Sequence, residues 1–166
     1  QLTHSGRFAR PTADGPSPRI AFRHPVLDPR LGIDSDAPML SDAELEAIAE
    51  RYVAAAKVAR EVGYDFVDVK CCHGYLLHEC LAARTRPGPY GGSFENRTRL
   101  LGRIAGDIRR EAPGLAIGVR VSIADIIAHE ADPTSGVGVP SRLDAALPYD
   151  FGFGVDRYDP LRFDMD

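Results

Sequence analysis

Two predicted helices, each followed within a few residues by a short apolar strand, constrain the fold of this 166-residue chain most strongly. Residues 41–63 carry apolar side chains at helical spacing, and residues 64–69 follow directly with mostly apolar, partly β-branched side chains. The same order recurs from residue 93 onward, where a second helical pattern precedes the apolar run 116–121. Such short connections are typical of parallel sheets. The pattern therefore predicts an α/β fold with helices outside a parallel sheet.

Both helices have recognisable ends. Ser41 and Glu44 have the spacing of a capping box, and Gly63 is suited to ending the first helix. Ser93 is a good N-cap for the second helix, which Pro113 would stop. One face of the second helix is predicted to contain Phe94, Leu101, Ile104, Ala105 and Ile108.

Between these helices, strand alternation would direct Val67 and Val69 to one side and Phe66 and Asp68 to the other. A short helix is predicted over residues 75–83, before a turn rich in glycine and proline.

Length and a hydrophobic content of 44% predict a single domain over residues 1–166. Within it, residues 1–40 would form a first strand and a proline-rich extended excursion. Residues 41–122 would form the βα core, and residues 123–166 a loop-rich tail. Because the chain opens directly on QLTH, with Gln1 in place of a methionine, we expect it to be part of a longer protein.

Charge and hydropathy exclude several classes of function. Twenty basic and 24 acidic side chains, giving a net charge of −4, argue against a nucleic-acid partner. Without an apolar run of roughly 18 residues or a secretory signal pattern, we expect a cytoplasmic protein with no membrane contact. The three cysteines are odd in number and crowded into ten positions, which is no disulfide framework, and they are predicted to be reduced. A small molecule is the expected partner, and formation of a homo-oligomer stays open.

Reactive side chains cluster directly after the strand at residues 64–69. They are Lys70, Cys71, Cys72, His73 and Tyr75. Arg120 stands near the end of the next predicted strand. Residues just past the carboxyl ends of parallel strands line the active sites of α/β enzymes. The cluster is therefore predicted to be functional.

The side chains themselves allow several chemistries. Lys70 could form a Schiff base, or stay charged and hold an anion, or simply reach solvent. His73 could donate to a substrate carbonyl, act as a general acid or base, bind a metal, or be a structural side chain. The Tyr75 hydroxyl could reach the same pocket as a proton donor, or Tyr75 could simply pack at the start of a helix. Adjacent Cys71 and Cys72 are poorly placed to bind one tetrahedral ion, so no metal site is predicted.

Four segments occur in an order and at a spacing that mark one enzyme family. They are QLTHSGR, HGYLLHECL, YGGSFENRTRLL and IGVRVS, which together cover about residues 1–122. These segments resemble the old yellow enzyme family of FMN-dependent oxidoreductases. The resemblance implies part of a (β/α)8 TIM barrel, about its third to fifth strands. It also implies FMN as cofactor, NADH or NADPH as reductant, and hydride transfer through the flavin to an activated alkene or similar acceptor.

The same resemblance implies roles for individual residues. Gln1 matches the glutamine that binds the flavin pyrimidine edge, and Arg120 matches the arginine that stabilises the reduced flavin near N1. His73 matches the second member of the substrate-binding pair, and Tyr75 matches the tyrosine that donates a proton to substrate. Lys70 stands where the family has histidine, and is predicted to bind substrate with a preference for a carboxylate or enolate oxygen.

Two departures from the family pattern keep other functions open. Lys70 would also suit a Schiff-base aldolase or lyase on the same barrel. The remaining strands and the phosphate-binding loops of the family lie outside residues 1–166. The sequence therefore predicts a fragment that is inactive and binds FMN weakly by itself, or a non-catalytic piece of a truncated barrel.

Overall fold

The computed structural model describes residues 1–164, which divide into two compact units. The first unit contains Gln1–Arg23 and Pro38–Ser122, and the second contains His24–Ala37 and the described residues from Ile123 onward. The sequence predicts one domain over residues 1–166, whereas the internal contacts separate two units. The physical reason is that the tail has a small apolar core of its own.

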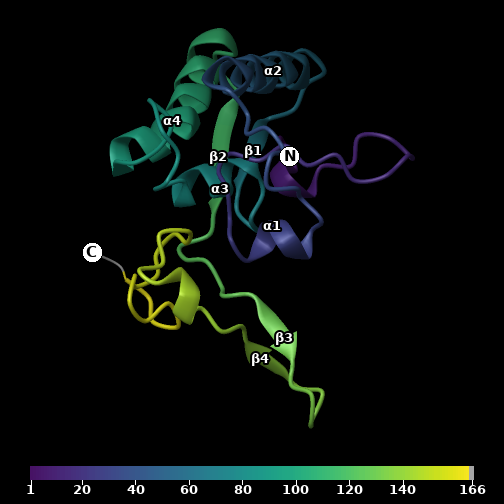
Figure 1. Cartoon of the computed structure of the whole chain (residues 1–166). Coiled ribbons are helices and arrows are strands. Elements are labelled where there is room, and N and C mark those ends of the chain that lie inside the picture. The colour runs from purple at the N-terminus through teal and green to yellow at the C-terminus, as the bar shows by residue number, and fades with distance from the viewer. Residues whose placement is uncertain (165–166) are drawn as a thin grey trace. The chain divides into compact units, whose positions relative to one another are not determined.

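The first unit consists of two long helices, a short helix and two paired strands (Figure 1). Helices α2 (Asp42–Glu61) and α4 (Phe94–Glu111) pack on each other, and α3 (Leu76–Ala82) packs on α4. Strands β1 (Phe66–Cys71) and β2 (Ala116–Val121) are parallel neighbours. Between residues 41 and 122 the predicted order of helices and strands is confirmed, and each of these elements begins and ends within two residues of its predicted bounds.

The N-terminal segment joins this sheet through a single residue. Leu2 pairs in parallel with Val69: its N–H donates to the Asp68 carbonyl at 2.8 Å, and its carbonyl accepts from the Lys70 N–H at 3.0 Å. The predicted first strand is therefore a one-residue bridge along β1. A 3-10 helix, Gly6–Phe8, follows it.

Local hydrogen bonds explain where the long helices begin. Ser41 Oγ accepts from the Glu44 N–H at 3.2 Å, and the Glu44 carboxylate accepts from the Ser41 N–H at 2.8 Å, which completes the predicted capping box. Ser93 Oγ accepts from the Asn96 N–H at 3.3 Å at the start of α4. Both predicted N-caps are confirmed.

The core of the first unit lies on one face of β1. Val67 and Val69 are buried, whereas Phe66 is 59% exposed, as the alternation predicts. On α4 the buried residues are Arg97, Leu100, Ile104 and Ile108. The prediction that Phe94 shares the apolar face of α4 is wrong, because Arg97 takes the inward position in the first turn and Phe94 is exposed.

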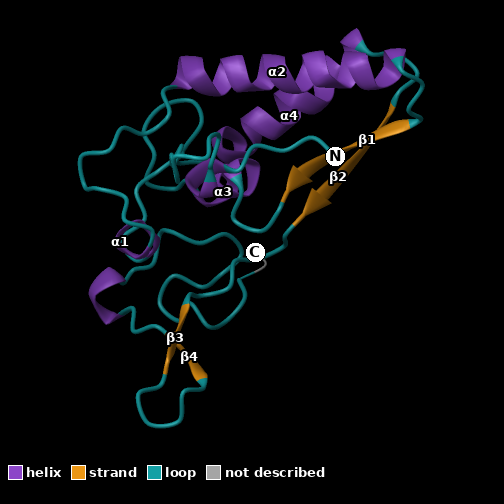
Figure 2. Cartoon of the chain, turned by 90° about the vertical axis from the view of Figure 1, so that its right-hand side faces the viewer, coloured by secondary structure: helices purple, strands orange, loops and turns teal. Residues whose placement is uncertain are grey.

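The second unit has little regular structure among its described residues. It contains one helical turn, α1 (Leu27–Arg30), a short 3-10 helix, Asp144–Ala146, and an antiparallel hairpin of β3 (His129–Ala131) and β4 (Gly138–Pro140) (Figure 2). Its buried core consists of Ile127, Tyr149 and Val155. Outside the hairpin the tail is mostly loops.

Two kinds of feature are missing from residues 1–164. None of their helices is both long and apolar enough to cross a bilayer. No group of three or more His, Cys, Asp and Glu side chains in this range could hold a metal ion. The cytoplasmic location and the absence of a metal stay predictions.

Candidate flavin and substrate site

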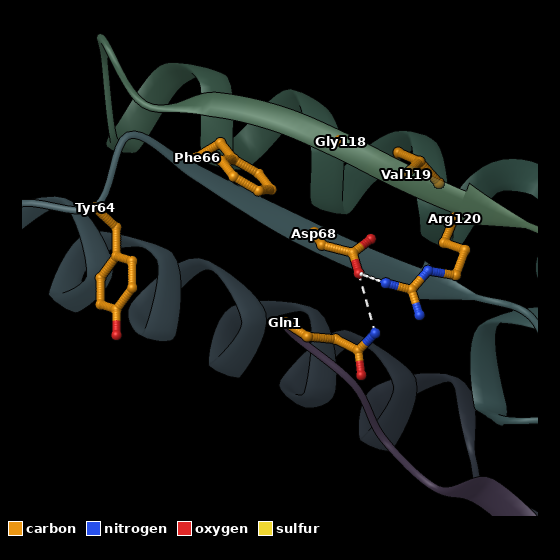
Figure 3. Close-up of a pocket in the computed structure, with 7 residues that line it drawn as sticks. All are labelled: Gln1, Tyr64, Phe66, Asp68, Gly118, Val119 and Arg120. Atoms are coloured by element: carbon orange, nitrogen blue, oxygen red, sulfur yellow. Dashed lines mark hydrogen bonds and ion pairs between the residues drawn. The ribbon is translucent and has the colours of Figure 1, made fainter.

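A cavity of about 600 Å³ lies over the face of β1 and β2 that carries Phe66 and Asp68 (Figure 3). It is lined by Gln1, Tyr64, Phe66, Asp68, Gly118, Val119 and Arg120. Asp68 and Gly118 are opposite each other in the strand register. A Cβ atom added at Gly118 would lie 3.8 Å from its nearest neighbour, the Val67 carbonyl oxygen, so the surface of β2 is open there.

Asp68 links the two residues that the resemblance assigns to the flavin. Its Oδ2 atom accepts hydrogen bonds from Gln1 Nε2 at 3.0 Å and from Arg120 Nη2 at 2.6 Å. The Asp68 side chain is 18% exposed and that of Arg120 is 55% exposed. The structure thus brings together Gln1 from the N-terminus and Arg120 from β2, on the two sides of β1.

Lys70 lies near the end of β1 and is only 8% exposed. Its Nζ atom is 3.2 Å from the centroid of the Tyr75 ring, a favourable cation–π contact. Within residues 1–164, no carboxylate pairs with this ammonium group. The alternative in which Lys70 simply extends into solvent does not hold in this structure.

The chain turns sharply after β1 at two successive residues with positive φ. His73 has φ of +62° and Gly74 has φ of +67°. The left-handed region is unusual for a residue other than glycine, and such backbone strain concentrates at functional sites. The His73 N–H donates to Ser122 Oγ at 3.3 Å, and the Gly74 N–H donates to His78 Nδ1 at 2.8 Å. These bonds hold the turn, and the His73 residue remains exposed.

Tyr75 is the N-cap residue of α3 and is half-buried. Besides the contact with Lys70, its ring centroid lies 6.2 Å from that of Phe8. The structure therefore brings Lys70 and Tyr75 into direct contact. No side-chain hydrogen bond within residues 1–164 joins this pair to the Gln1, Asp68 and Arg120 group.

Cys71, Cys72 and Cys80 are free and buried, as predicted for reduced thiols. Burial raises the pKa of the Cys71 thiol to about 12, and it also raises the pKa of Cys80. Because the thiolate is the reactive form, neither Cys71 nor Cys80 is a nucleophile at neutral pH.

Two residues that hydrogen-bond to the predicted site residues, Asp68 and Ser122, were not themselves predicted. Asp68 was placed on the correct face of its strand, but its partners depend on which strands lie beside β1. Ser122, which holds the turn at His73, carries no recognisable signal beyond its position after a strand. Arg97, which the sequence does not single out as a site residue, is buried and donates to the carbonyls of Leu81 and Gly92.

Sequence comparison decides the family. Residues 1–139 match the model of the NADH:flavin oxidoreductase / NADH oxidase family. The chain belongs to this family. The recognition from the four sequence segments is thereby confirmed, and FMN with NADH or NADPH is confirmed as the cofactor set of the family.

Individual relatives agree with this assignment. A NADPH dehydrogenase of Bacillus subtilis is 34% identical over 141 residues, which make up 83% of this chain and 39% of that protein. A NADH:flavin oxidoreductase of Gibberella zeae is 37% identical over 103 residues, 60% of this chain and 25% of that protein. A solved structure of a 2-naphthoyl-CoA reductase aligns with a TM-score of 0.59 at 26% identity, over 72% of this chain and 20% of that one. The chain spans 39% or less of the length of each.

Proposed function

We propose that this chain is the central part of a (β/α)8 barrel in an FMN-dependent oxidoreductase, with Leu2, β1 and β2 as parts of about its third to fifth strands. The observation that carries the proposal is the meeting of Gln1 and Arg120 at Asp68. Gln1 and Arg120 are 119 positions apart in the sequence. They come from separate segments and converge on one face of a parallel sheet. The family and the relatives support a function with NADH or NADPH as reductant.

The cavity residues fit the pyrimidine edge of a flavin. That edge alternates carbonyl acceptors with an N–H donor, and the Gln1 amide offers one donor group and one acceptor. Arg120 offers further donors and a positive charge, and Gly118, opposite Asp68 in the strand register, leaves the surface of β2 open. FMN, when bound there, would supply the acceptor for hydride from the nicotinamide and the donor of hydride to the substrate.

Lys70 and His73 are proposed to hold an oxygen of the substrate. The ammonium group of Lys70 is largely buried and has no carboxylate partner among residues 1–164, which favours a ligand with an anionic or strongly polarised oxygen. The contact of the Lys70 ammonium group with the Tyr75 ring supports a role for the Tyr75 phenol beside that oxygen. The substrate is an activated alkene that bears a carboxylate, thioester or carbonyl group; as its β-carbon accepts hydride, Tyr75 donates a proton to its α-carbon, and the double bond becomes a single bond.

Neither the family nor the relatives named above supports a Schiff-base aldolase or lyase, or a non-catalytic role. The isolated 166 residues are proposed to bind FMN weakly and to lack activity, because the phosphate-binding loops of the family lie outside them. The whole protein that contains this chain is therefore the proper subject of a test.

The test separates the two halves of the reaction by anaerobic stopped-flow absorbance. In the FMN-loaded protein, NADH or NADPH should bleach the flavin, and an α,β-unsaturated acid or thioester should restore its colour. Tyr75→Phe should leave the first step unchanged and slow the second about 100- to 10,000-fold. Tyr158→Phe, at an exposed tyrosine of the second unit, is the control. Flavin that nicotinamide does not bleach, or equal slowing of both steps by Tyr75→Phe, would refute the proposal.

A further inference from the structure

Asp68 is the acceptor shared by Gln1 and Arg120, and it is neither a flavin-binding nor a substrate-binding residue of the proposed site. We propose that Asp68 is a positioning residue, which orients both side chains toward the flavin and offsets the charge of Arg120. Through these two effects it sets the affinity for FMN and the reduction potential of the bound flavin. This inference rests on the proposed function and extends it to a third residue.

The position of Asp68 suits this role. It lies on β1, whose flanking Val67 and Val69 are buried, so its backbone is fixed by the core. Its side chain is 18% exposed, whereas the Arg120 side chain is 55% exposed and Gln1 is exposed. The shielded Asp68 side chain therefore holds two more exposed side chains, one on each side of its strand.

The carboxylate also decides which end of the Gln1 amide faces the cavity. A carboxylate only accepts hydrogen bonds, so it engages the Nε2 end, at 3.0 Å. The Oε1 end then points away from Asp68, as Figure 3 shows, and is available to accept a hydrogen bond. Arg120 uses Nη2 for Asp68 at 2.6 Å and keeps its other N–H groups for a ligand. Because these side chains are ordered before the ligand arrives, less rotamer entropy is lost on binding.

The charge of Asp68 acts on the flavin in its reduced form. Arg120 and Asp68 together carry no net formal charge, so the attraction of Arg120 for added negative charge is partly cancelled. If Asp68 is replaced by asparagine, the side-chain shape and an acceptor oxygen remain, but the positive charge of Arg120 is no longer offset. The reduced flavin is more negative than the oxidised flavin. The variant should therefore bind reduced flavin more tightly, relative to oxidised flavin, than the wild type does.

The experiment measures the reduction potential and the FMN dissociation constant in the whole protein. Asp68→Asn should favour reduced over oxidised flavin about tenfold, which raises the potential by about 30 mV for a two-electron couple. Asp68→Ala, which also removes the acceptor, should weaken binding of oxidised FMN about tenfold. Asp65→Asn makes the same change of charge at an exposed residue outside the cavity lining, and should leave both quantities unchanged. Circular dichroism spectra and melting temperatures of the three variants confirm that each is folded.

The outcomes separate this inference from the proposed function. If wild-type protein takes up FMN but Asp68→Asn keeps the wild-type potential, Asp68 has no electrostatic role and the inference is overturned. An unchanged FMN affinity in Asp68→Ala would equally overturn the positioning role. Wild-type protein that takes up no FMN would overturn the proposed function itself, and this inference with it.

Discussion

The Lys70 ammonium nitrogen lies 3.2 Å from the centroid of the Tyr75 ring, so the cation rests directly on the face of the phenol. Lys70 is 8% exposed, and no carboxylate in the described part of the chain neutralises it. A largely buried positive charge favours an anionic ligand, because such a ligand replaces the contacts that the charge would make with water. The contact therefore joins the proposed substrate-binding residue to the proposed proton donor.

Lys70→Met should weaken the binding of an anionic ligand and spare a neutral one of the same shape. Loss of a hydrogen bond to a charged group corresponds to about 10- to 100-fold in affinity. Calorimetric titration of the FMN-loaded protein with benzoate and with benzamide makes the comparison. Lys57→Met, on the exposed surface of α2, should change neither affinity. Equal losses for benzoate and benzamide would contradict the anion-binding role.

Glu79 should make the stability of the first unit depend on pH. It is fully buried, and its Oε1 accepts from Arg7 Nη2 at 2.6 Å and from the Ala21 N–H at 3.0 Å. Burial raises the pKa of Glu79 from about 4.5 to about 7, although Arg7 acts in the opposite direction. Between these two values the folded chain keeps a proton that the unfolded chain has lost. The free energy of unfolding should therefore fall as pH rises from about 4.5 to about 7, by at most about 1.4 kcal/mol per pH unit.

Urea unfolding at a series of pH values tests the contribution of Glu79. Glu79→Gln removes the titrating group, so its unfolding free energy should lose this fall with pH. Glu50→Gln, at an exposed position of α2, should retain the wild-type profile. Parallel profiles for wild type and Glu79→Gln across this range would show that Glu79 does not titrate there.

The same substitution should have opposite effects at two glycines. A Cβ atom at Gly91 would lie 2.2 Å from the Arg86 carbonyl oxygen, so Gly91→Ala should destabilise the chain by about 1–3 kcal/mol. Gly102 is exposed within α4, and apart from the backbone of its own helix no atom lies near such a Cβ, so Gly102→Ala should stabilise by up to about 1 kcal/mol. Thermal unfolding of the two variants measures both effects. Shifts of the same sign would contradict the packing described around Gly91.

Local signals made most of the first unit predictable. The capping residues Ser41 and Ser93 mark where the long helices begin, and strand alternation separates buried Val67 from exposed Phe66. These features depend on neighbouring residues alone. The reduction of the first strand to one bridge at Leu2 and the inward position of Arg97 depend on distant partners, which no local pattern records.

The sequence selected candidate residues for the site but not their contacts. The resemblance selected Gln1 and Arg120, whereas their common partner Asp68 follows only from the parallel pairing of β1 with its neighbours. Lys70 and Tyr75 are brought into contact by the turn between them, in which His73 adopts positive φ. A histidine gives no sequence signal for that conformation, so the contact could not be foreseen.

The most direct test of the central claim is a fluorescence titration of FMN into the whole protein, with and without the Arg120 guanidinium. Arg109→Met, at an exposed position of α4, is the control for loss of a positive charge. We predict that wild type and Arg109→Met bind FMN with equal affinity, and that Arg120→Met binds about 10- to 100-fold more weakly. Equal affinity in all three proteins, or no binding of FMN by any of them, would contradict a flavin site at Gln1, Asp68 and Arg120.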